Sequence, residues 1–389
     1  MAVRNCPQIA LLIDTATDWG RRMIRGIGRY AKQHGGWDIW LEQRCQHAPG
    51  RLPPGWCGDG IIARVADRAM GSYLTEAPGV VVNVSSARIP GVSFPTVTAD
   101  LHAAAQLAVE HLLDQGFGHF GYFAPLGSSY VDVHYRSFME RLAAAGLDCD
   151  LLPARRRQGK GSKATWQRQQ DELRCWLQEL PKPVAVVTWT SDRGREVLYA
   201  CRAVGLLVPE QVAVMGGDED SLLCETCNPP LSGVALTSER IGYEAAALLD
   251  RLLRGETPPE EPTLIEPTRV VVRQSTDTLA ITDPDLARAI AFVRAHATTP
   301  IQVNDILREV PISRSSLERR FQEALGRSPA EEIRRVRLER TKQFLADTDM
   351  PVEKIAAASG FGSREYLANA FKQATGLTPR EFRNRTRGR

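Results

Sequence analysis

Short apolar runs alternate with amphipathic segments along the first two thirds of the chain, up to about residue 273. Runs that are apolar throughout predict strands buried on both faces of a sheet, and helices between such strands predict parallel strand order. The predicted strands number nine or more and include 9–13, 37–42, 60–65, 80–84, 120–124, 184–189 and 212–216. The predicted helices include 20–34, 101–115, 135–145, 193–204 and 238–254. Because so many strands exceed one comfortable sheet, we expect a two-lobed α/β domain, with parallel sheets flanked by helices and a cleft between the lobes.

The last third of the chain has no strand pattern and instead predicts an all-α domain with two helix-turn-helix units. Apolar residues recur at helical spacing throughout it. The predicted helices are 285–296, 303–310, 313–324, 330–347, 352–359 and 363–375. The expected cores of the two units consist of Ile306, Leu307, Val310, Ile312, Leu317 and Phe321, and of Ile355, Phe361, Leu367 and Phe371.

An internal repeat with a period of about 50 residues supports this interpretation. Phe321 is followed by Gln-Glu-Ala-Leu-Gly-Arg-Ser-Pro329, and Phe371 by Lys-Gln-Ala-Thr-Gly-Leu-Thr-Pro379. Residues 274–284 are mostly polar and end on a proline, which is typical of a linker. The sequence therefore predicts a ligand-sensing domain over 7–273, a linker over 274–284 and a helix-turn-helix domain over 285–386.

In a helix-turn-helix unit the second helix enters the major groove of DNA, with its N-terminal residues at the base edges. Arginine matches the acceptor pair of guanine, and asparagine matches the donor and acceptor of adenine. The candidate DNA-binding residues are Arg314, Ser315, Ser316, Arg319, Ser363, Arg364, Glu365, Asn369 and Lys372. The alternative for each of them is a solvated helix face.

Charge is distributed unevenly and favours the DNA-binding interpretation. The whole chain carries a formal charge of +3, but residues 284–389 carry 20 Lys and Arg against 13 Asp and Glu. Basic charge concentrated in one terminal domain is typical of proteins that bind a polyanion.

Ligands of doubly wound α/β folds bind at the carboxyl ends of the strands, so the loops after the predicted strands are the places to inspect. These loops, at 14–21, 125–134, 190–193 and 216–220, combine hydroxyl, carboxylate, guanidinium and aromatic groups. Such a set suits the hydroxyls and the apolar face of a sugar. The candidate ligand-binding residues are Asp14, Trp19, Arg21, Tyr130, Asp132, His134, Thr190, Ser191, Arg193 and Asp218. The alternative for any one polar residue is that it only caps a helix.

Sequence patterns of enzymes, metal sites and membrane proteins are absent. There is no Gly-x-Ser-x-Gly, phosphate-loop or His-Glu-x-x-His motif. Gly26 and Gly28 lie within a predicted helix, which argues against a dinucleotide fingerprint. Cys224 and Cys227 form the only CxxC pair, and a zinc site would need a second pair. We therefore expect no catalytic residues, no metal, no cofactor and reduced thiols.

The apolar run at 9–13 is too short for a signal peptide or a membrane helix. We therefore expect a cytoplasmic protein without a membrane partner. A transport-type solute-binding protein is the first alternative, but it would need a signal peptide and has no use for a basic tail. The second alternative is an enzyme with an appended DNA-binding domain, and the missing catalytic set argues against it.

The C-terminal 100 residues, roughly, resemble the DNA-binding domains of the AraC/XylS family. The resemblance rests on Arg337-Leu-Glu-Arg-Thr-Lys-Gln-Phe-Leu-Ala, Gly360-Phe, Phe371-Lys and Gly376-Leu-Thr-Pro379. It implies two helix-turn-helix units that read adjacent major grooves on one face of operator DNA. One departure is Pro311, which stands in the first turn where a glycine is more usual.

The N-terminal part resembles the effector domains of LacI/GalR-type repressors, which are similar to periplasmic sugar-binding proteins. The matching stretches begin at Ala108-Val-Glu-His-Leu-Leu, Val208-Pro-Glu and Val212-Ala-Val-Met-Gly-Gly-Asp218. The resemblance implies that Asp218 hydrogen-bonds a sugar. Two departures fall at the expected site. Thr190-Ser191 replaces a polar Asn-Asp-like pair, and Tyr130 with His134 replaces a tryptophan and an arginine.

Together the two resemblances imply a transcription regulator, an activator, of a carbohydrate-utilisation operon. Its effector would be a small sugar such as xylose, bound between the lobes. The implied partners are double-stranded operator DNA, the sugar and RNA polymerase. Relatives of both halves act as dimers, so a homodimer is also expected.

Overall fold

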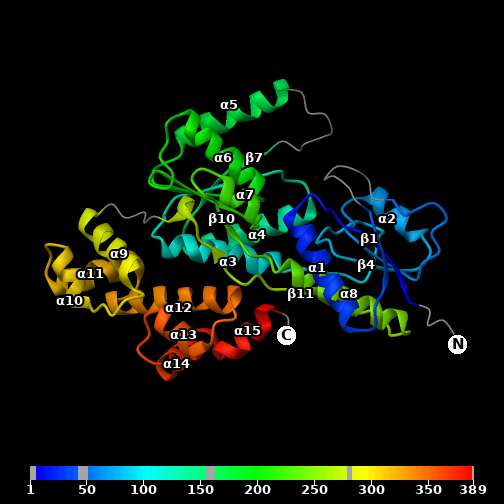
Figure 1. Ribbon diagram of the computed structural model, residues 1–389. Coiled ribbons are helices and arrows are strands. Elements are labelled where there is room, and N and C mark those ends of the chain that lie inside the picture. The colour runs from blue at the N-terminus through cyan, green and yellow to red at the C-terminus, as the bar shows by residue number, and fades with distance from the viewer. Residues whose placement is uncertain (1–5, 43–50, 155–162, 278–282, 388–389) are drawn as a thin grey trace. The chain divides into compact units, whose positions relative to one another are not determined.

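The computed structural model describes residues 6–42, 51–154, 163–277 and 283–387 (Figure 1). The chain forms two compact units. One comprises residues 1–112 and 118–278, and the other comprises residues 279–389 with 113–117. Within the described ranges, no helix has the length and apolar character that crossing a bilayer requires.

The first lobe of the larger unit is built on a parallel sheet with the strand order β2-β1-β3-β4. Its strands are β1 (Gln8–Leu12), β2 (Asp38–Leu41), β3 (Gly60–Ala63) and β4 (Val80–Asn83). The central strands β1 and β3 pair in parallel and are buried almost throughout, as their apolar runs predict. A short parallel pair, β5 (Val97–Ala99) with β11 (Thr263–Ile265), continues this lobe.

Helices α1 (Asp18–Gln33), α2 (Arg68–Thr75) and α8 (Ser238–Leu253) also belong to this lobe. The backbones of α1 and α8 approach each other so closely that only glycine fits. A Cβ at Gly26 would lie 1.9 Å from Glu239 O, and one at Gly242 would lie 2.0 Å from Met23 O. Gly26 therefore serves helix packing, in agreement with the rejection of a dinucleotide fingerprint.

The second lobe contains a larger sheet, with the strand order β12-β10-β9-β8-β6-β7. Its strands are β6 (Phe120–Ala124), β7 (Cys149–Pro153), β8 (Val184–Thr188), β9 (Val212–Gly216), β10 (Ser232–Val234) and β12 (Val270–Val271). All neighbours are parallel except β12, which runs antiparallel to β10. The helices along this part of the chain are α3 (Leu101–Asp114), α4 (Ser129–Ala143), α5 (Lys163–Glu179), α6 (Ser191–Ala203) and α7 (Ser221–Thr226).

The chain passes from lobe to lobe between β5 and β6, between β10 and α8, and between β11 and β12. These crossings bring the loops after the strands of both sheets to a common cleft, the position at which open α/β sheets bind ligands.

The first residues of the predicted linker belong to the second lobe. Gln274–Thr276 form the short 3-10 helix η1, and the side chains of Ser275 and Thr276 are buried. The Ser275 hydroxyl donates to Val214 O at 2.6 Å, and the Thr276 hydroxyl pairs with Ser232 Oγ at 2.7 Å. The polar residues that indicated a linker are therefore part of a buried hydroxyl network. Residues 278–282 of the predicted linker lie outside the described residues.

The C-terminal unit contains the six predicted helices and one more. The predicted ones are α9 (Pro284–His296), α10 (Val303–Glu309), α11 (Arg314–Leu325), α12 (Pro329–Asp347), α13 (Val352–Ala358) and α14 (Arg364–Thr375), and the additional one is α15 (Pro379–Arg387). The repeat extends to the hydrogen bonds that start and end helices. Ser313 and Ser363 cap α11 and α14, which end at left-handed glycines, Gly326 and Gly376. Such a glycine commonly ends a helix because it has no Cβ to clash.

Each helix-turn-helix unit has its own core, and α12 contributes to both. Ile306, Leu317 and Phe321 are buried in the first core, together with Ile333 of α12. The second core contains all four residues predicted for it, Ile355, Phe361, Leu367 and Phe371. Leu338 and Leu345 of α12 are buried with them. The predicted fold of this unit is confirmed.

Candidate ligand pocket and nucleic-acid interface

A cavity of about 150 Å³ lies where the two lobes of the larger unit meet. We call it the inter-lobe pocket. Five of the predicted ligand residues line it, from the segments that follow β1, β6, β8 and β9, including the first turns of α1 and α4: Asp14, Trp19, Tyr130, Thr190 and Asp218. The other lining residues are Thr17, Arg64, Val84, Ser85, Ser86, Thr98, Ala99, Leu101, Trp189, Gly217 and Leu236. The pocket therefore collects groups from both lobes.

The first lobe contributes a carboxylate, an indole and a guanidinium. Asp14 is buried, and its Oδ1 accepts a hydrogen bond from Ala16 N at 3.0 Å, which shapes the turn before α1. The Arg64 guanidinium lies over the Trp19 ring, 5.7 Å from the ring centroid. A cation in this position is attracted by the negative face of the ring, so each side chain orients the other.

The second lobe contributes a pair of aromatic rings. Tyr130 extends from the first turn of α4, and Trp189 follows β8. Their ring centroids lie 5.4 Å apart, with the planes tilted by 47°. Large rings in this arrangement offer an apolar face inside a pocket that is otherwise rich in polar groups.

Asp218 is the most perturbed acid of the pocket. Ser191 N and Ser191 Oγ donate to its Oδ1 at 2.6 and 2.7 Å, so both hydrogen bonds are made by one carboxylate oxygen. Burial raises the pKa of Asp218 to about 6, against the opposing effect of the Ser191 hydrogen bonds. Because neither Ser191 bond uses Oδ2, that oxygen is available in the pocket to accept from a hydroxyl.

An adjoining cavity of about 430 Å³ shares Trp19, Arg64, Tyr130, Trp189 and Asp218 with the inter-lobe pocket. Its further lining residues are Arg22, Ala66, Pro125, Ser128, Ser191, Asp192, Arg193, Glu219, Asp220, Leu223 and Ser238. Two predicted ligand residues, Ser191 and Arg193, line this cavity but not the inter-lobe pocket.

Both of them already have partners within the second lobe. Ser191 holds Asp218, as described above, and the buried Arg193 forms an ion pair with Glu196 at 2.9 Å. Thr190 combines two roles, because it lines both cavities and also caps α6 by accepting from Arg193 N at 3.4 Å.

The remaining predicted ligand residues line neither cavity. Arg21 Nη1 donates to the carbonyls of Thr15 and Ala16, at 3.2 and 2.9 Å, and so closes the loop before α1. Asp132 Oδ1 accepts from Gly127 N at 2.8 Å at the start of α4. For these two residues the structure corresponds to the alternative stated above, in which a polar side chain stabilises a loop or a helix end.

His134 lies behind the aromatic wall and not in the pocket. Its side chain is fully buried, and Nδ1 is hydrogen-bonded to Tyr122 Oη at 2.7 Å. Its ring packs edge-on against Trp189, with the centroids 5.5 Å apart. Burial lowers the pKa of His134 to about 4, so the imidazole is neutral at physiological pH. His134 therefore supports Trp189 and does not line either cavity.

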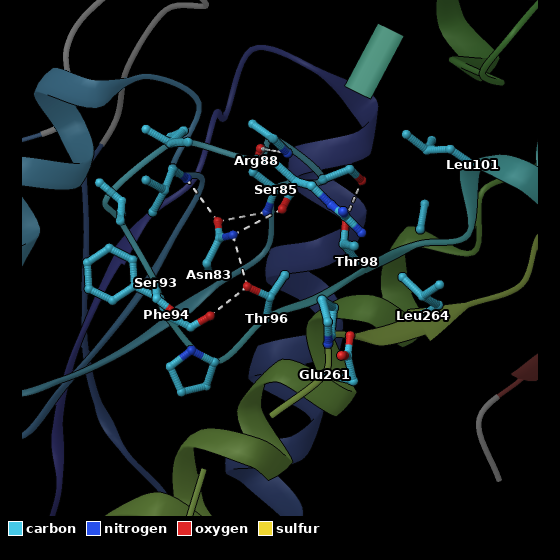
Figure 2. A pocket seen from close by; sticks show the side chains of 18 of the residues that line it. Asn83, Ser85, Arg88, Ser93, Phe94, Thr96, Thr98, Leu101, Glu261 and Leu264 are labelled. Carbon is cyan, nitrogen blue, oxygen red and sulfur yellow. Dashed lines mark hydrogen bonds between the residues drawn. The ribbon is translucent and has the colours of Figure 1, made fainter. Parts of the chain in front are cut away.

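A third cavity, of about 780 Å³, borders the inter-lobe pocket but is lined almost wholly by the first lobe (Figure 2). It shares Ser85, Ser86 and Thr98 with that pocket, and Ser86 Oγ lies 2.6 Å from Thr98 Oγ1. Figure 2 shows Asn83 holding the loop in place through hydrogen bonds to the Ser85 backbone and to Thr96. The inter-lobe pocket and its adjoining cavity differ from this third cavity, because both lobes supply them with charged and aromatic groups.

Sequence reasoning missed several lining residues of the inter-lobe pocket. Arg64 follows β3, Ser85 and Ser86 follow β4, and Thr98 lies in β5. The rule that ligands bind after the carboxyl ends of strands applies to Arg64 and to both serines, so this signal was available. Trp189 stands at the end of a predicted strand and was assigned to the sheet.

The candidate DNA-binding residues lie on α11 and α14 and at their N-terminal caps, and most of them are exposed. In the first unit Arg314, Ser315 and Arg319 are exposed. Ser316 is only partly exposed, and its hydroxyl accepts from Arg320 Nε at 3.1 Å, so it has a structural role. In the second unit the exposed residues are Ser363, Arg364, Glu365, Asn369 and Lys372.

Ion pairs hold the two exposed arginines of α11. Arg314 pairs with Glu318 at 3.1 Å and Arg319 pairs with Glu323 at 3.2 Å, each one helical turn along. Exposed pairs of this kind contribute at most about 1 kcal/mol. They can therefore open at little cost, which leaves both guanidinium groups available to another acceptor.

Family models match most of the chain. A model described as a XylR N-terminal domain matches residues 8–100, and one described as a periplasmic binding protein-like domain matches residues 109–276. A helix-turn-helix domain model matches residues 306–385. The predicted composition of the chain, a binding-protein-like unit followed by a helix-turn-helix unit, is confirmed.

Relatives share this composition over nearly their full length. The chain is 30% identical to the xylose operon regulatory protein of Escherichia coli (strain K12) over 385 residues, which cover 97% of each chain. It is also 30% identical to the xylose operon regulatory protein of Haemophilus influenzae, over 97% of this chain and 98% of that one. A solved structure of the xylose-binding transcription activator XylR superposes with a TM-score of 0.64 at 28% identity, covering 98% and 99% of the two chains.

Proposed function

We propose a specific function for this chain, which belongs to the family of the xylose operon regulatory proteins. Members of this family are sugar-responsive, DNA-binding transcription regulators, and the chain has both parts that this role requires. Beyond this, we propose that it activates a carbohydrate-utilisation operon when a small sugar, xylose or a close relative of it, binds in the inter-lobe pocket.

The observation that carries the proposal is the meeting of Asp14, Trp19 and Arg64 from one lobe with Trp189 and Asp218 from the other. Carboxylates accept from sugar hydroxyls, a guanidinium donates to them, and the rings cover the apolar C–H face. Relatives named for xylose favour a pentose. Because the sugar would contact both lobes, its binding favours the closed arrangement over an open one.

On the DNA side, we propose that the exposed residues of α11 and α14 read two neighbouring segments of the major groove. Helix-turn-helix domains place the N-terminal part of the second helix at the base edges. We further propose that two copies of the chain bind paired half-sites and contact RNA polymerase. The proposed sensing domain begins at residue 7 and extends beyond the predicted limit of 273 to include η1 (Gln274–Thr276), and the proposed DNA-binding domain remains 285–386.

The proposal predicts that sugar and DNA affect each other's binding equally. A ligand shifts a conformational equilibrium only by its differential affinity for the two states, and the coupling is reciprocal. We expect xylose to tighten binding to a duplex with two half-sites much more than to one with a single half-site. Calorimetry of xylose binding, with and without the paired duplex, should return the same coupling factor.

The duplex for this measurement is selected by the chain from a random-sequence library, so that no operator has to be known. Titrations with arabinose, ribose and glucose test the choice of sugar. Identical xylose affinities with and without the duplex would mean that the chain senses and binds DNA independently. Tighter binding of another sugar would replace xylose as the effector.

Sugar affinity should fall below pH 6 in a way that depends on Asp218. Since burial raises the pKa of Asp218 to about 6, acid converts the accepting carboxylate to a carboxylic acid. We expect affinity for xylose to be roughly tenfold weaker at pH 5 than at pH 7, provided that only the ionised form accepts the hydroxyls. Calorimetry at both values measures this, and Asp218→Asn should remove the pH dependence.

The stability of the sugar-free chain should depend on pH in the opposite direction to its sugar affinity, again because of Asp218. A carboxyl whose folded pKa lies above its unfolded value favours folding at low pH, and this contribution is lost as pH rises through about 6. As pH rises from 5 to 7, the melting temperature of the parent chain should therefore fall relative to that of Asp218→Asn. An unchanged difference would contradict the raised pKa.

A further inference from the structure

Glu219, the residue after Asp218, joins the two lobes through a double ion pair. Its Oε2 lies 2.9 Å from Arg22 Nη2, which belongs to α1 of the first lobe. Its Oε1 lies 2.6 Å from Arg273 Nη2, two residues beyond β12 of the second lobe. One carboxylate therefore bridges two cations that are about 250 residues apart in the sequence.

Because the bridge is buried, breaking it costs more free energy than breaking a surface ion pair. The Glu219 side chain is 5% exposed, Arg273 is 13% exposed and Arg22 is 31% exposed. A carboxylate this buried loses much of its hydration, so each cation that leaves it costs more than the loss of an exposed pair. Each of its two oxygens accepts from a different arginine, so neither arginine duplicates the hydrogen bond of the other.

Further contacts fasten α1 to the loop that follows β9. Arg22 also contacts Ser221, and its Nε lies 2.6 Å from Asp18 Oδ2. Asp18 N in turn donates to Asp220 Oδ2 at 3.3 Å. The Arg22–Ser221 and Asp18–Asp220 contacts cross from one lobe to the other beside the pocket that contains Asp218, whereas the Asp18–Arg22 pair lies within α1. The two crossing contacts break if the lobes separate, since their partners belong to different lobes.

On its other side the bridge leads to the segment that precedes the DNA-binding unit. Arg273 N donates to Ser232 Oγ at 2.8 Å, and its Nη1 donates to Leu231 O at 3.1 Å. The next residues form η1, whose Ser275 and Thr276 belong to the buried hydroxyl network of β9 and β10. Along the chain, η1 is the last described element before α9.

We infer that Glu219 is a positioning residue that couples closure of the lobes to the Arg273–Thr276 segment, through which sugar binding reaches the DNA-binding unit. This inference rests on the proposed function and assigns a residue to its regulation. The two adjacent residues have different roles. Asp218 faces the inter-lobe pocket, and Glu219 pairs with Arg22 only when the two lobes are together. In the closed state Glu219 holds two cations. When the lobes open it retains Arg273 alone, so the restraint on Arg273 changes with the state of the cleft.

A first experiment tests the coupling without any ligand. Amide hydrogen exchange is measured on the full chain carrying Arg22→Met or Glu219→Gln. Arg22→Met alters only the first lobe, yet it should raise exchange at residues 273–277, about tenfold, because Glu219 loses its second cation. The matched control is Arg29→Met. Arg29 also lies on α1, is equally exposed at 31% and pairs with Glu239 at 2.8 Å, but both partners belong to the first lobe.

Exchange at residues 273–277 that is unchanged in Arg22→Met, or raised equally in Arg29→Met, would overturn the inference. This outcome does not depend on which sugar or DNA the chain binds. Loss of the whole exchange pattern in Glu219→Gln would indicate misfolding, and Arg22→Met alone then decides the question.

A second experiment measures function with D-xylose and the library-selected duplex. We expect Arg22→Met to weaken xylose binding about tenfold, because the closed state loses a buried contact. Arg273→Met should leave xylose affinity within about threefold of the parent value, but should reduce the factor by which xylose tightens DNA binding. Equal effects of the two variants on xylose affinity would contradict the division of roles. A parent chain that does not respond to xylose would reject the proposed function, and the exchange experiment would still decide on Glu219.

Discussion

Replacing Asp218 by asparagine is expected to abolish the thermal stabilisation that sugar gives the parent chain. The substitution keeps the size of the side chain but removes the ionised oxygen that accepts from sugar hydroxyls. Loss of a charged hydrogen bond costs about 1.5–3 kcal/mol for each bond, and Asp218 is placed to make more than one. A ligand at 100 times its dissociation constant stabilises a protein by about 2.7 kcal/mol, so a loss of this size removes the effect. Differential scanning fluorimetry with xylose measures it.

Asp132→Asn is the matched control for this experiment. It makes the same chemical change on a carboxylate that was also predicted to bind the ligand, but Asp132 accepts from Gly127 N and lines neither inter-lobe cavity. We expect its response to xylose to match that of the parent chain. If Asp218→Asn still responds fully, Asp218 only anchors Ser191 and the pocket assignment is wrong. If Asp132→Asn loses the response, the sugar binds nearer the start of α4.

Binding of the full chain to DNA is expected to weaken steeply with salt. The C-terminal unit carries an excess of basic residues and exposes cations on α11 and α14. Each phosphate that a protein neutralises contributes about −0.9 to the slope of log affinity against log salt. About six such contacts would lower the affinity roughly a thousandfold between 50 and 200 mM salt. Fluorescence anisotropy with a labelled duplex measures the slope, and a slope near zero would contradict the DNA-binding face.

The same titration separates base contacts from phosphate contacts. Arg314→Ala and Arg364→Ala should each relax preference at one base position, at a cost of about 1–3 kcal/mol on the selected duplex. Arg308→Ala is a suitable control, since Arg308 is 80% exposed on α10, outside the two recognition helices. A loss that is equal on random DNA would reassign Arg314 or Arg364 to the phosphate backbone.

Apolar runs and helical spacing were enough to predict most of the fold, because they record burial directly. Strands such as β6 and β9 match their predicted limits, and both helix-turn-helix cores contain the expected residues. Strands β10 and β12 were missed because they span only three and two residues, too few for any periodicity to show. Helix α5 was missed although Leu173, Trp176 and Leu177 recur at helical spacing and are buried.

One displaced helix start accounts for part of the disagreement at the site. The sequence predicts a helix from residue 135, whereas α4 begins at Ser129, so Asp132 and His134 lie on a helix and not in a binding loop. On a helix, residues four apart share a face, which places His134 behind Tyr130 and against Trp189. The contribution of Thr98, which lies within β5, depends on how the lobes are assembled, and no local pattern reports that arrangement.

The close approach of α1 and α8 has a consequence for how the protein is made. The first lobe contains the strands β1 to β5 together with α8 and β11, which lie near the end of the sensing unit. The ribosome synthesises about 5–20 residues per second, so the strands of the first lobe are made long before residues 238–265. Until then the face of α1 that carries Met23 and Ile27 has no partner from α8. The nascent first lobe therefore keeps this apolar surface exposed for several seconds or more, and during that interval it is open to non-native association.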